Sequence, residues 1–419
     1  MHGTKRWGIA FAGFVTQIAL GGVYAWSVFR IPLTREFGWT ISQVTWTFTI
    51  AIGGLGIGAF FGGLLLNRTS PRFVAIAGGT LNGLGVFMAC FSAHKLWWLY
   101  LSYGVMGGIG LGFAYIVPIS VLVKWFPDRR GLITGIAVSG FGAGALVTAP
   151  VATHLIQDPS IGVLKAFAYL GISYLVITCT AGFFMQNPPA DWCPSGWVLS
   201  PIKVSQRATK DFTVGNALAS WQWWALWLLL FLNGTAGISL ISQEAPIFEK
   251  LTGVTAAAAA GMVGIVSIGN GVGRIFWASL SDAISRRWTY AALFLLQTGL
   301  FWLLPLQSSA TAITAISFII LMCYGGGYGT MPAFVADYFG SKNVGPIYGL
   351  MATAWSCAGF AGPQILIRLL GPSGSYATGL HTVALVMLVS LVLPILVSPP
   401  KPRAPNQTHA AQVDSPHNR

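Results

Sequence analysis

Apolar runs recur along almost the whole chain, and short segments rich in proline, glycine and charged residues separate them. Each run is about 20 residues long, so as an α-helix it would cross the roughly 30 Å hydrocarbon core of a bilayer. The pattern therefore predicts an all-α polytopic membrane protein with twelve transmembrane helices. They begin near Trp7, Val44, Phe73, Trp97, Leu132, Val163, Trp221, Val254, Trp288, Thr311, Gly345 and Ala377.

One polar segment, residues 186–220, interrupts this pattern for longer than any other. It contains four prolines and three basic residues, and we expect it to be a cytoplasmic loop. It divides the chain into a first six-helix half (1–185) and a second six-helix half (221–398). The remaining residues, 399–419, are polar and rich in Pro, Asn and Gln, a composition typical of a disordered tail.

The two halves repeat each other. An offset of 214 residues separates matching prolines and glycines in three pairs of predicted helices, and the short basic loops after the second and eighth helices agree to within a residue. Two pseudo-symmetric halves are therefore expected. The matching pairs are Pro32 and Pro246, Pro118 and Pro332, and Gly135 and Gly349.

Composition excludes a soluble protein, and the distribution of charge excludes a nucleic-acid partner. Hydrophobic residues make up 54% of the 419 residues, charged residues make up 8%, and the mean hydropathy is +0.69. The net charge is +13, but with a cytoplasmic N-terminus sixteen of the 23 Lys and Arg lie in cytoplasmic segments and six in external loops. This is the positive-inside bias of membrane proteins. We expect a multi-pass protein of the cell membrane, surrounded by lipid, with both termini in the cytoplasm.

Motifs for enzyme chemistry do not occur in the sequence. The chain lacks the Gly-x-Ser-x-Gly, His-Glu-x-x-His and phosphate-binding-loop patterns, and its five cysteines show no metal-binding spacing. We expect no catalytic residue, no metal, no cofactor and no enzymatic activity. We also expect the chain to function as a monomer.

Arg274 is the one cation inside a predicted span, in the apolar, glycine-rich stretch Gly261–Leu280. A charge at that depth costs roughly 2.5–3.5 kcal/mol on insertion scales, so such residues normally face a water-filled pathway. Asn270 precedes it by four residues and shares its helix face. A guanidinium offers a fixed fork of donors that fits a carboxylate. The pair predicts a carboxylate-binding site, and the alternative is that Arg274 reaches the helix end or pairs with a structural acid.

Four tyrosines at a similar depth, Tyr24, Tyr115, Tyr324 and Tyr328, are the next candidates for this site. Each supplies an apolar ring and one hydroxyl group, which suits a small organic anion with an alkyl part. Tyr324 and Tyr328 are four residues apart and flank the glycines at 325–327. Ordinary packing is the alternative for each of the four.

The two short basic loops resemble the signature of the major facilitator superfamily, which follows its second and eighth helices. That signature reads Gly, three residues, Asp-Arg, and then Gly with basic residues. Asn67 stands where the family has Asp, whereas Asp282 keeps the carboxylate. The resemblance implies two parallel six-helix repeats with a substrate site between them near the midplane. The matching positions are Gly63, Asn67, Arg68, Pro71 and Arg72, and in the second half Ala278, Asp282, Arg286 and Arg287.

Longer segments resemble the oxalate/formate antiporter family and, more distantly, the animal monocarboxylate transporters. The resemblance implies that Arg274 binds the substrate carboxylate and that the four tyrosines line the cavity. The segments are YAW at 24–26, Tyr115 with KWFPDRRGL at 124–132, NGVGRIFW at 270–277, and YGGGY at 324–328.

Three positions depart from those families. Trp355 stands where the oxalate carrier has a second cation, a lysine in helix 11, which argues against a dianionic substrate. Val28 and Asn270 stand where the animal carriers have a lysine and an aspartate, so the usual proton-handling groups are absent. His381 near the outer end of helix 12 and Glu244 near the outer end of helix 7 are the candidates that remain for carrying a proton.

These features predict a secondary transporter of small monocarboxylates of the lactate or pyruvate class, with Arg274 as the anion anchor. Proton symport is the first mode predicted, and exchange of two anions is the second. A carboxylate sensor that does not transport is an alternative from a different class. A cation exporter is disfavoured because the sequence places no acid in the middle of a span.

Overall fold

Helices form all the regular structure in the part of the chain that the computed structural model describes, residues 2–189, 192–194, 211–369 and 375–400. Most of the predicted disordered tail and residues 195–210 of the predicted middle loop lie outside these ranges. The first half contains α1 (His2–Leu20), η1 (Gly21–Ala25), α2 (Trp26–Phe37), α3 (Ile41–Leu66), α4 (Pro71–Met88), η2 (Ala89–Phe91), α5 (Leu96–Leu99), the π-helical η3 (Tyr100–Gly107), α6 (Gly108–Trp125), α7 (Arg130–Gln157) and α8 (Gly162–Gly182). A short helix, α10 (Val214–Leu218), lies inside the predicted middle loop. The second half contains α11 (Trp221–Thr252), α12 (Ala256–Ile284), α13 (Arg286–Leu303), η4 (Leu304–Leu306), α14 (Ala310–Phe339), α15 (Val344–Arg368), α16 (Ala377–Ser390) and α17 (Val392–Leu396).

The ends of the helices repeat between the two halves. Gly38 after α2 and Gly253 after α11 both adopt the left-handed conformation, with φ of 71° and 70°, which glycine adopts without steric cost. The next helices begin after Thr40 and Thr255, whose hydroxyl oxygens accept a backbone N–H from the first turn. Both pairs are 215 residues apart. The predicted pair of pseudo-symmetric halves is therefore confirmed at the level of individual helix caps.

Eleven helices in the described part of the chain are long and apolar enough to cross a membrane. The predicted span that these eleven leave out is the one beginning near Gly345, which corresponds to α15 and contains four glycines and two prolines. Large apolar side chains such as Phe61, Trp224 and Phe360 lie on the outer surface, each more than half exposed. Such a surface suits hydrocarbon as the surrounding solvent.

Glycines allow close packing both within the first half and between the halves. A Cβ added at Gly58 of α3 would lie 2.2 Å from the carbonyl oxygen of Ile109 in α6, inside the first half. A Cβ at Gly63, one turn further along α3, would lie 2.4 Å from the backbone nitrogen of Pro346 in α15, across the boundary. The boundary between the halves is thus packed backbone to backbone at this level.

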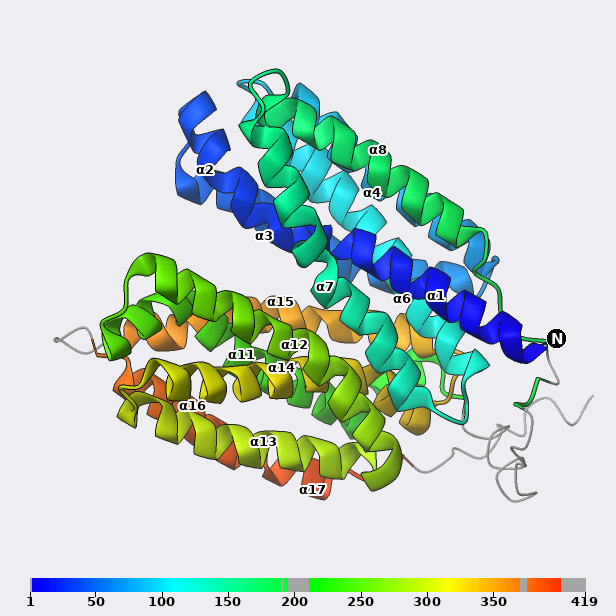
Figure 1. Cartoon of the computed structure of the whole chain (residues 1–419). Helices are drawn as coiled ribbons and strands as arrows, with labels where there is room; N and C mark the ends of the chain where they lie inside the picture. Colours follow the sequence, from blue (N-terminus) through cyan, green and yellow to red (C-terminus); the bar gives the residue numbers. More distant parts are fainter. Residues whose placement is uncertain (1, 190–191, 195–210, 370–374, 401–419) are drawn as a thin grey trace, which may run out of the picture.

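The two halves meet at one end of the molecule. We call the end that carries the N-terminus and the α6–α7 turn the N-side, and the opposite end the far side. Figure 1 shows α1 to α8 and α11 to α17 in contact at the N-side and diverging toward the far side. The described hydrogen bonds and ion pairs that join the halves all lie at the N-side or at mid-height, where Tyr115 meets Tyr348.

Candidate substrate-binding site

Arg274 lies in the middle of α12 and is buried, with 2% of its surface exposed. Its Nη1 donates to the carbonyl oxygen of Val138 in α7 at 2.8 Å. Its Nε donates to Oδ1 of Asn270, one turn earlier on the same helix, at 3.3 Å. Arg274 therefore crosses from the second half to the first, and Asn270 orients it.

Small residues make room for this arrangement. A Cβ at Gly142 of α7 would lie 3.2 Å from the guanidinium carbon of Arg274, and one at Gly135 would lie 2.5 Å from its carbonyl oxygen. A Cβ at Gly329 of α14 would lie 2.4 Å from the same carbonyl oxygen. Helix α12 can therefore lie against both α7 and α14, which places its charge between the halves.

The charge of Arg274 is not balanced by an acid. None of the ion pairs among the described residues includes Arg274, and both acceptors bonded to it are neutral. A buried cation without a counter-ion is costly, because charge is poorly solvated in the protein interior. The arrangement favours an anion as its missing partner.

A small cavity lies beside the guanidinium and has residues of both halves in its wall. Its volume is about 20 Å³. By the same measure one water requires roughly 10–15 Å³, so the cavity has room for one or two waters. The wall is mostly aromatic, and none of the lining residues is Asp, Glu or His. It consists of Tyr24, Leu55, Tyr115, Val138, Phe141, Leu230, Arg274, Tyr324, Tyr328, Tyr348, Ala352 and Trp355.

Some hydroxyl and indole groups in the wall already have hydrogen-bond partners within the protein, and one does not. Trp355 Nε1 donates to the hydroxyl of Tyr324 at 3.2 Å, and the hydroxyls of Tyr115 and Tyr348 are 3.4 Å apart. The hydroxyl of Tyr328 is buried and has no hydrogen-bond partner. It is therefore free to bind a ligand.

The structure brings together most of the residues predicted for the site. All four predicted tyrosines, Arg274 and Trp355 line the cavity, and Asn270 contacts it through Arg274. Val28, His381 and Glu244 are not among the lining residues.

His381 stacks on Trp302, with ring centroids 4.4 Å apart, so it lies between α16 and α13. Sequence reasoning did not include Tyr348 in the site. Its position seven residues before Trp355, on the same face of α15, is the signal that could have identified it.

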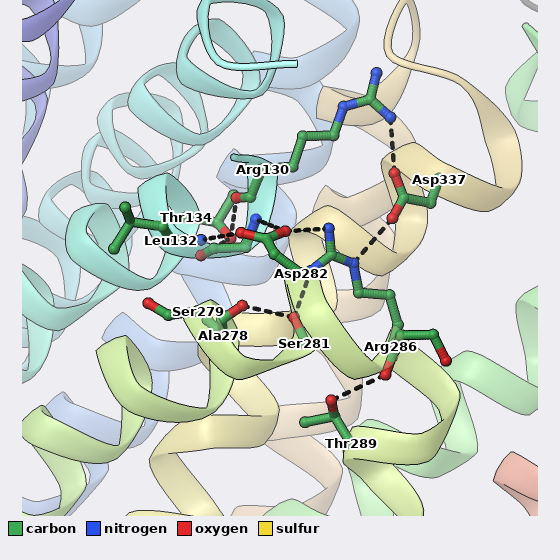
Figure 2. A network of polar contacts seen from close by, with 12 residues as sticks. Arg130, Leu132, Thr134, Ala278, Ser279, Ser281, Asp282, Arg286, Thr289 and Asp337 are labelled. Atoms are coloured by element: carbon green, nitrogen blue, oxygen red, sulfur yellow. Dashed lines mark hydrogen bonds and ion pairs between the residues drawn. The ribbon is translucent and has the colours of Figure 1, made fainter. Parts of the chain in front are cut away.

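Charged residues at the N-side join the halves in a second cluster, which Figure 2 shows. Asp282 accepts the backbone N–H groups of Gly131 and Leu132 at the start of α7, both at 2.9 Å, where the helix dipole favours an anion. Asp337 pairs with Arg130 at 2.7 Å and with Arg286 at 2.9 Å. The second loop of the predicted signature thus closes the N-side.

The corresponding loop of the first half uses an uncharged contact. The side-chain amide of Asn67 donates to Oδ1 of Asn343 at 2.8 Å. The amide takes the place of the carboxylate that the family pattern has there, so the two loops close the N-side by different means.

Comparisons with known proteins agree with this fold. The sequence model of the Major Facilitator Superfamily matches residues 9–363 and, in a second alignment, residues 252–416. Among solved structures, the transporter FucP in its outward conformation superposes with a TM-score of 0.69, covering 92% of this chain and 97% of that chain at 16% identity. At that identity the likeness concerns the fold.

Curated relatives include transporters of both predicted families. The uncharacterized MFS-type transporter YhjX of Escherichia coli is 30% identical, over 83% of this chain and 84% of its own. The oxalate:formate antiporter of Oxalobacter formigenes is 26% identical, over 95% of this chain and 94% of its own. Monocarboxylate transporter 2 of Rattus norvegicus is 26% identical, over 88% of this chain and 78% of its own. The resemblance predicted from the sequence motifs is confirmed.

Proposed function

Because the chain belongs to the Major Facilitator Superfamily, we propose that it is a secondary active transporter of small monocarboxylates, with Arg274 anchoring the carboxylate. The observation that carries the proposal is a buried guanidinium with neutral protein partners beside an aromatic cavity. One fixed positive charge balances one carboxylate. The relatives named for oxalate and formate and for monocarboxylates support a small carboxylate as the substrate.

Charge balance also explains why the carrier would change conformation more readily with an anion bound. When the two halves rock about the site, the empty site exposes an unbalanced charge to a drier interior. A bound monoanion neutralises that charge, so the loaded carrier changes conformation more readily than the empty one. The aromatic wall and its phenol hydroxyls suit a small anion with an apolar part.

We place the protein in the cell membrane, with its N-side facing the cytoplasm. The basic residues concentrate in the N-side segments, which supports this orientation by the positive-inside rule. The conformation is then outward-facing, because the halves diverge toward the far side.

Proton symport is the first mode we propose, with Glu244 and His381 as the candidates for the proton. Exchange of two anions is the second. The absence of Asp, Glu and His from the described lining of the cavity supports exchange, because exchange needs no titrating group.

Uptake of labelled L-lactate into proteoliposomes tests the proposal and separates the two modes. Accumulation driven by an inside-alkaline pH gradient would support symport. Uptake that ignores the gradient and requires a carboxylate preloaded inside would support exchange. Binding without counterflow would instead make the protein a sensor, and no response to lactate, pyruvate, formate or oxalate would overturn the proposal.

A further inference from the structure

Glu244 in α11 is the only buried acid among the residues that the structure describes, with 3% of its surface exposed. Its Oε1 has no hydrogen-bond partner, and no ion pair in the described ranges includes it. A carboxylate in such surroundings is poorly solvated, and the group avoids this cost by taking up a proton. Neither the cavity beside Arg274 nor the N-side cluster uses this residue.

A second unpartnered polar group lies at the same level on the neighbouring helix α14. Gly237 of α11 and Tyr324 of α14 lie at the same height, because a Cβ at Gly237 would lie 2.2 Å from Cδ2 of Tyr324. Helix α11 begins at the N-side and α14 ends there, so the two run in opposite directions. Glu244 comes seven residues after Gly237, and Ser317 comes seven residues before Tyr324. Seven residues are about two turns, so both lie roughly 10 Å beyond this contact, toward the far side, on the same two faces.

Ser317 is fully buried, and its Oγ also has no hydrogen-bond partner. Two unsatisfied polar groups on facing helices are costly unless they serve a function or gain partners in another conformation. An acid and a hydroxyl, both buried and both unpartnered, are therefore placed at the same level of the second half.

We propose that Glu244 is the proton-binding site of this transporter and that Ser317 is its hydrogen-bonding neighbour. The inference rests on the proposed function and selects one of its two proton candidates. A proton from the far-side solution forms the O–H bond of the Glu244 carboxylic acid while the far side is open. The same bond breaks after the change of conformation, and the proton leaves to the N-side solution with the anion.

Helix α14 supplies a direct mechanical connection between the proton and the anion. Ser317 and Tyr324 are on one face of this helix, and Tyr324 lines the cavity and accepts a hydrogen bond from Trp355. A shift of α14 that follows loss of the proton therefore moves a residue of the anion site. Coupling of this kind needs a shared rigid element, and no direct contact between the two ligands is required.

The charged and titratable groups around Glu244 are few. The far-side parts of α12 (256–269) and α14 (310–322) contain none. The imidazole of His381 stacks on Trp302 in α13, so it is directed at a different helix. The others lie at far-side helix ends: Glu249 and Lys250 at the end of α11, Arg368 at the end of α15, and Tyr376 before α16.

The test compares Glu244→Gln with wild type in proteoliposomes, by two assays on the same preparation. The variant is expected to lose at least 90% of the lactate accumulation driven by an inside-alkaline gradient, while lactate counterflow at equal pH stays within about twofold of wild type. Counterflow needs no net proton movement, so it reports the anion site alone. Glu244→Asp is expected to retain accumulation, and Glu249→Gln, an exposed acid one turn away, is the matched control.

Gradient-driven accumulation by Glu244→Gln would overturn the inference, as would loss restricted to His381→Gln. Loss of both assays in Glu244→Gln and in Glu244→Asp would also overturn it, because Glu244 would then serve the anion path or the fold. Accumulation by wild type that follows a sodium gradient in place of the pH gradient would show that the coupled ion is not a proton. If wild type shows neither accumulation nor counterflow, the failure belongs to the proposed function.

Discussion

The guanidinium of Arg274 has a fixed place and an unbalanced charge. Val138 and Asn270 hold it at 2.8 and 3.3 Å, so little side-chain freedom is left to lose when an anion binds. Both acceptors are neutral, which keeps the full positive charge available. The hydroxyl of Tyr328, buried and unpartnered in the same cavity, adds a donor.

Trp355 limits this cavity to a single cation, and replacing it with lysine is expected to change the preferred charge of the substrate. In Trp355→Lys a second ammonium can pair with a second carboxylate, and charge-assisted hydrogen bonds contribute about 1.5–3 kcal/mol each. We expect oxalate to inhibit lactate counterflow at least tenfold more strongly in the variant than in wild type. Trp355→Phe loses the bond to Tyr324 but keeps an aromatic ring and adds no charge, so it should keep the wild-type preference. Equal inhibition by oxalate in all three proteins would refute this role for Trp355.

At the scale of helices, the two halves close the N-side by unequal contacts. Asp282 binds the positive end of α7 and belongs to a network with two arginines (Figure 2), whereas Asn67 forms one amide contact with Asn343. Hydrogen bonds to a charged group are worth roughly twice those between neutral groups. The contact of α7 with α12 should therefore contribute more to N-side closure than the contact of α3 with α15.

Close backbone packing between α3 and α15 also contributes to closure of the N-side. In Gly63→Ala the added Cβ would lie 2.4 Å from the nitrogen of Pro346, and overpacking of this kind costs about 1–3 kcal/mol. The variant is expected to shift the population toward an open N-side, seen as a longer distance between spin labels at positions 68 and 342. Gly53→Ala on the same helix meets nothing within 4 Å and should leave the distance unchanged. Equal distances in both variants would contradict the packing argument.

For the whole molecule, the sequence was most informative about features that a membrane constrains strongly, such as a charged residue inside an apolar helix. A lone arginine within an apolar helix predicts a pathway, and a 214-residue offset between prolines predicts two halves, without knowledge of any contact. Contacts between distant segments had no such local signal. The contact of Asp282 with the start of α7 and the contact of Tyr348 with Tyr115 could not be predicted, because both depend on how the halves meet.

The orientation of the whole molecule in the membrane predicts which of its two sides an impermeant reagent can reach from outside the cell. After replacement of the native cysteines, Ser160→Cys on the far side should react with an impermeant maleimide in intact cells. Arg68→Cys on the N-side should react only after the cells are made permeable. Both positions are exposed in the described structure. The opposite labelling pattern would reverse the orientation and make the conformation inward-facing.

Binding of labelled L-lactate to the purified protein shows whether Arg274 holds the substrate carboxylate. Wild type is expected to bind saturably, and Arg274→Gln, which keeps polar groups and loses the charge, to bind at least 30-fold more weakly, equivalent to about 2 kcal/mol. Arg274→Lys keeps the charge without the fork of donors and should fall between them. Equal affinity of wild type and Arg274→Gln would contradict the account.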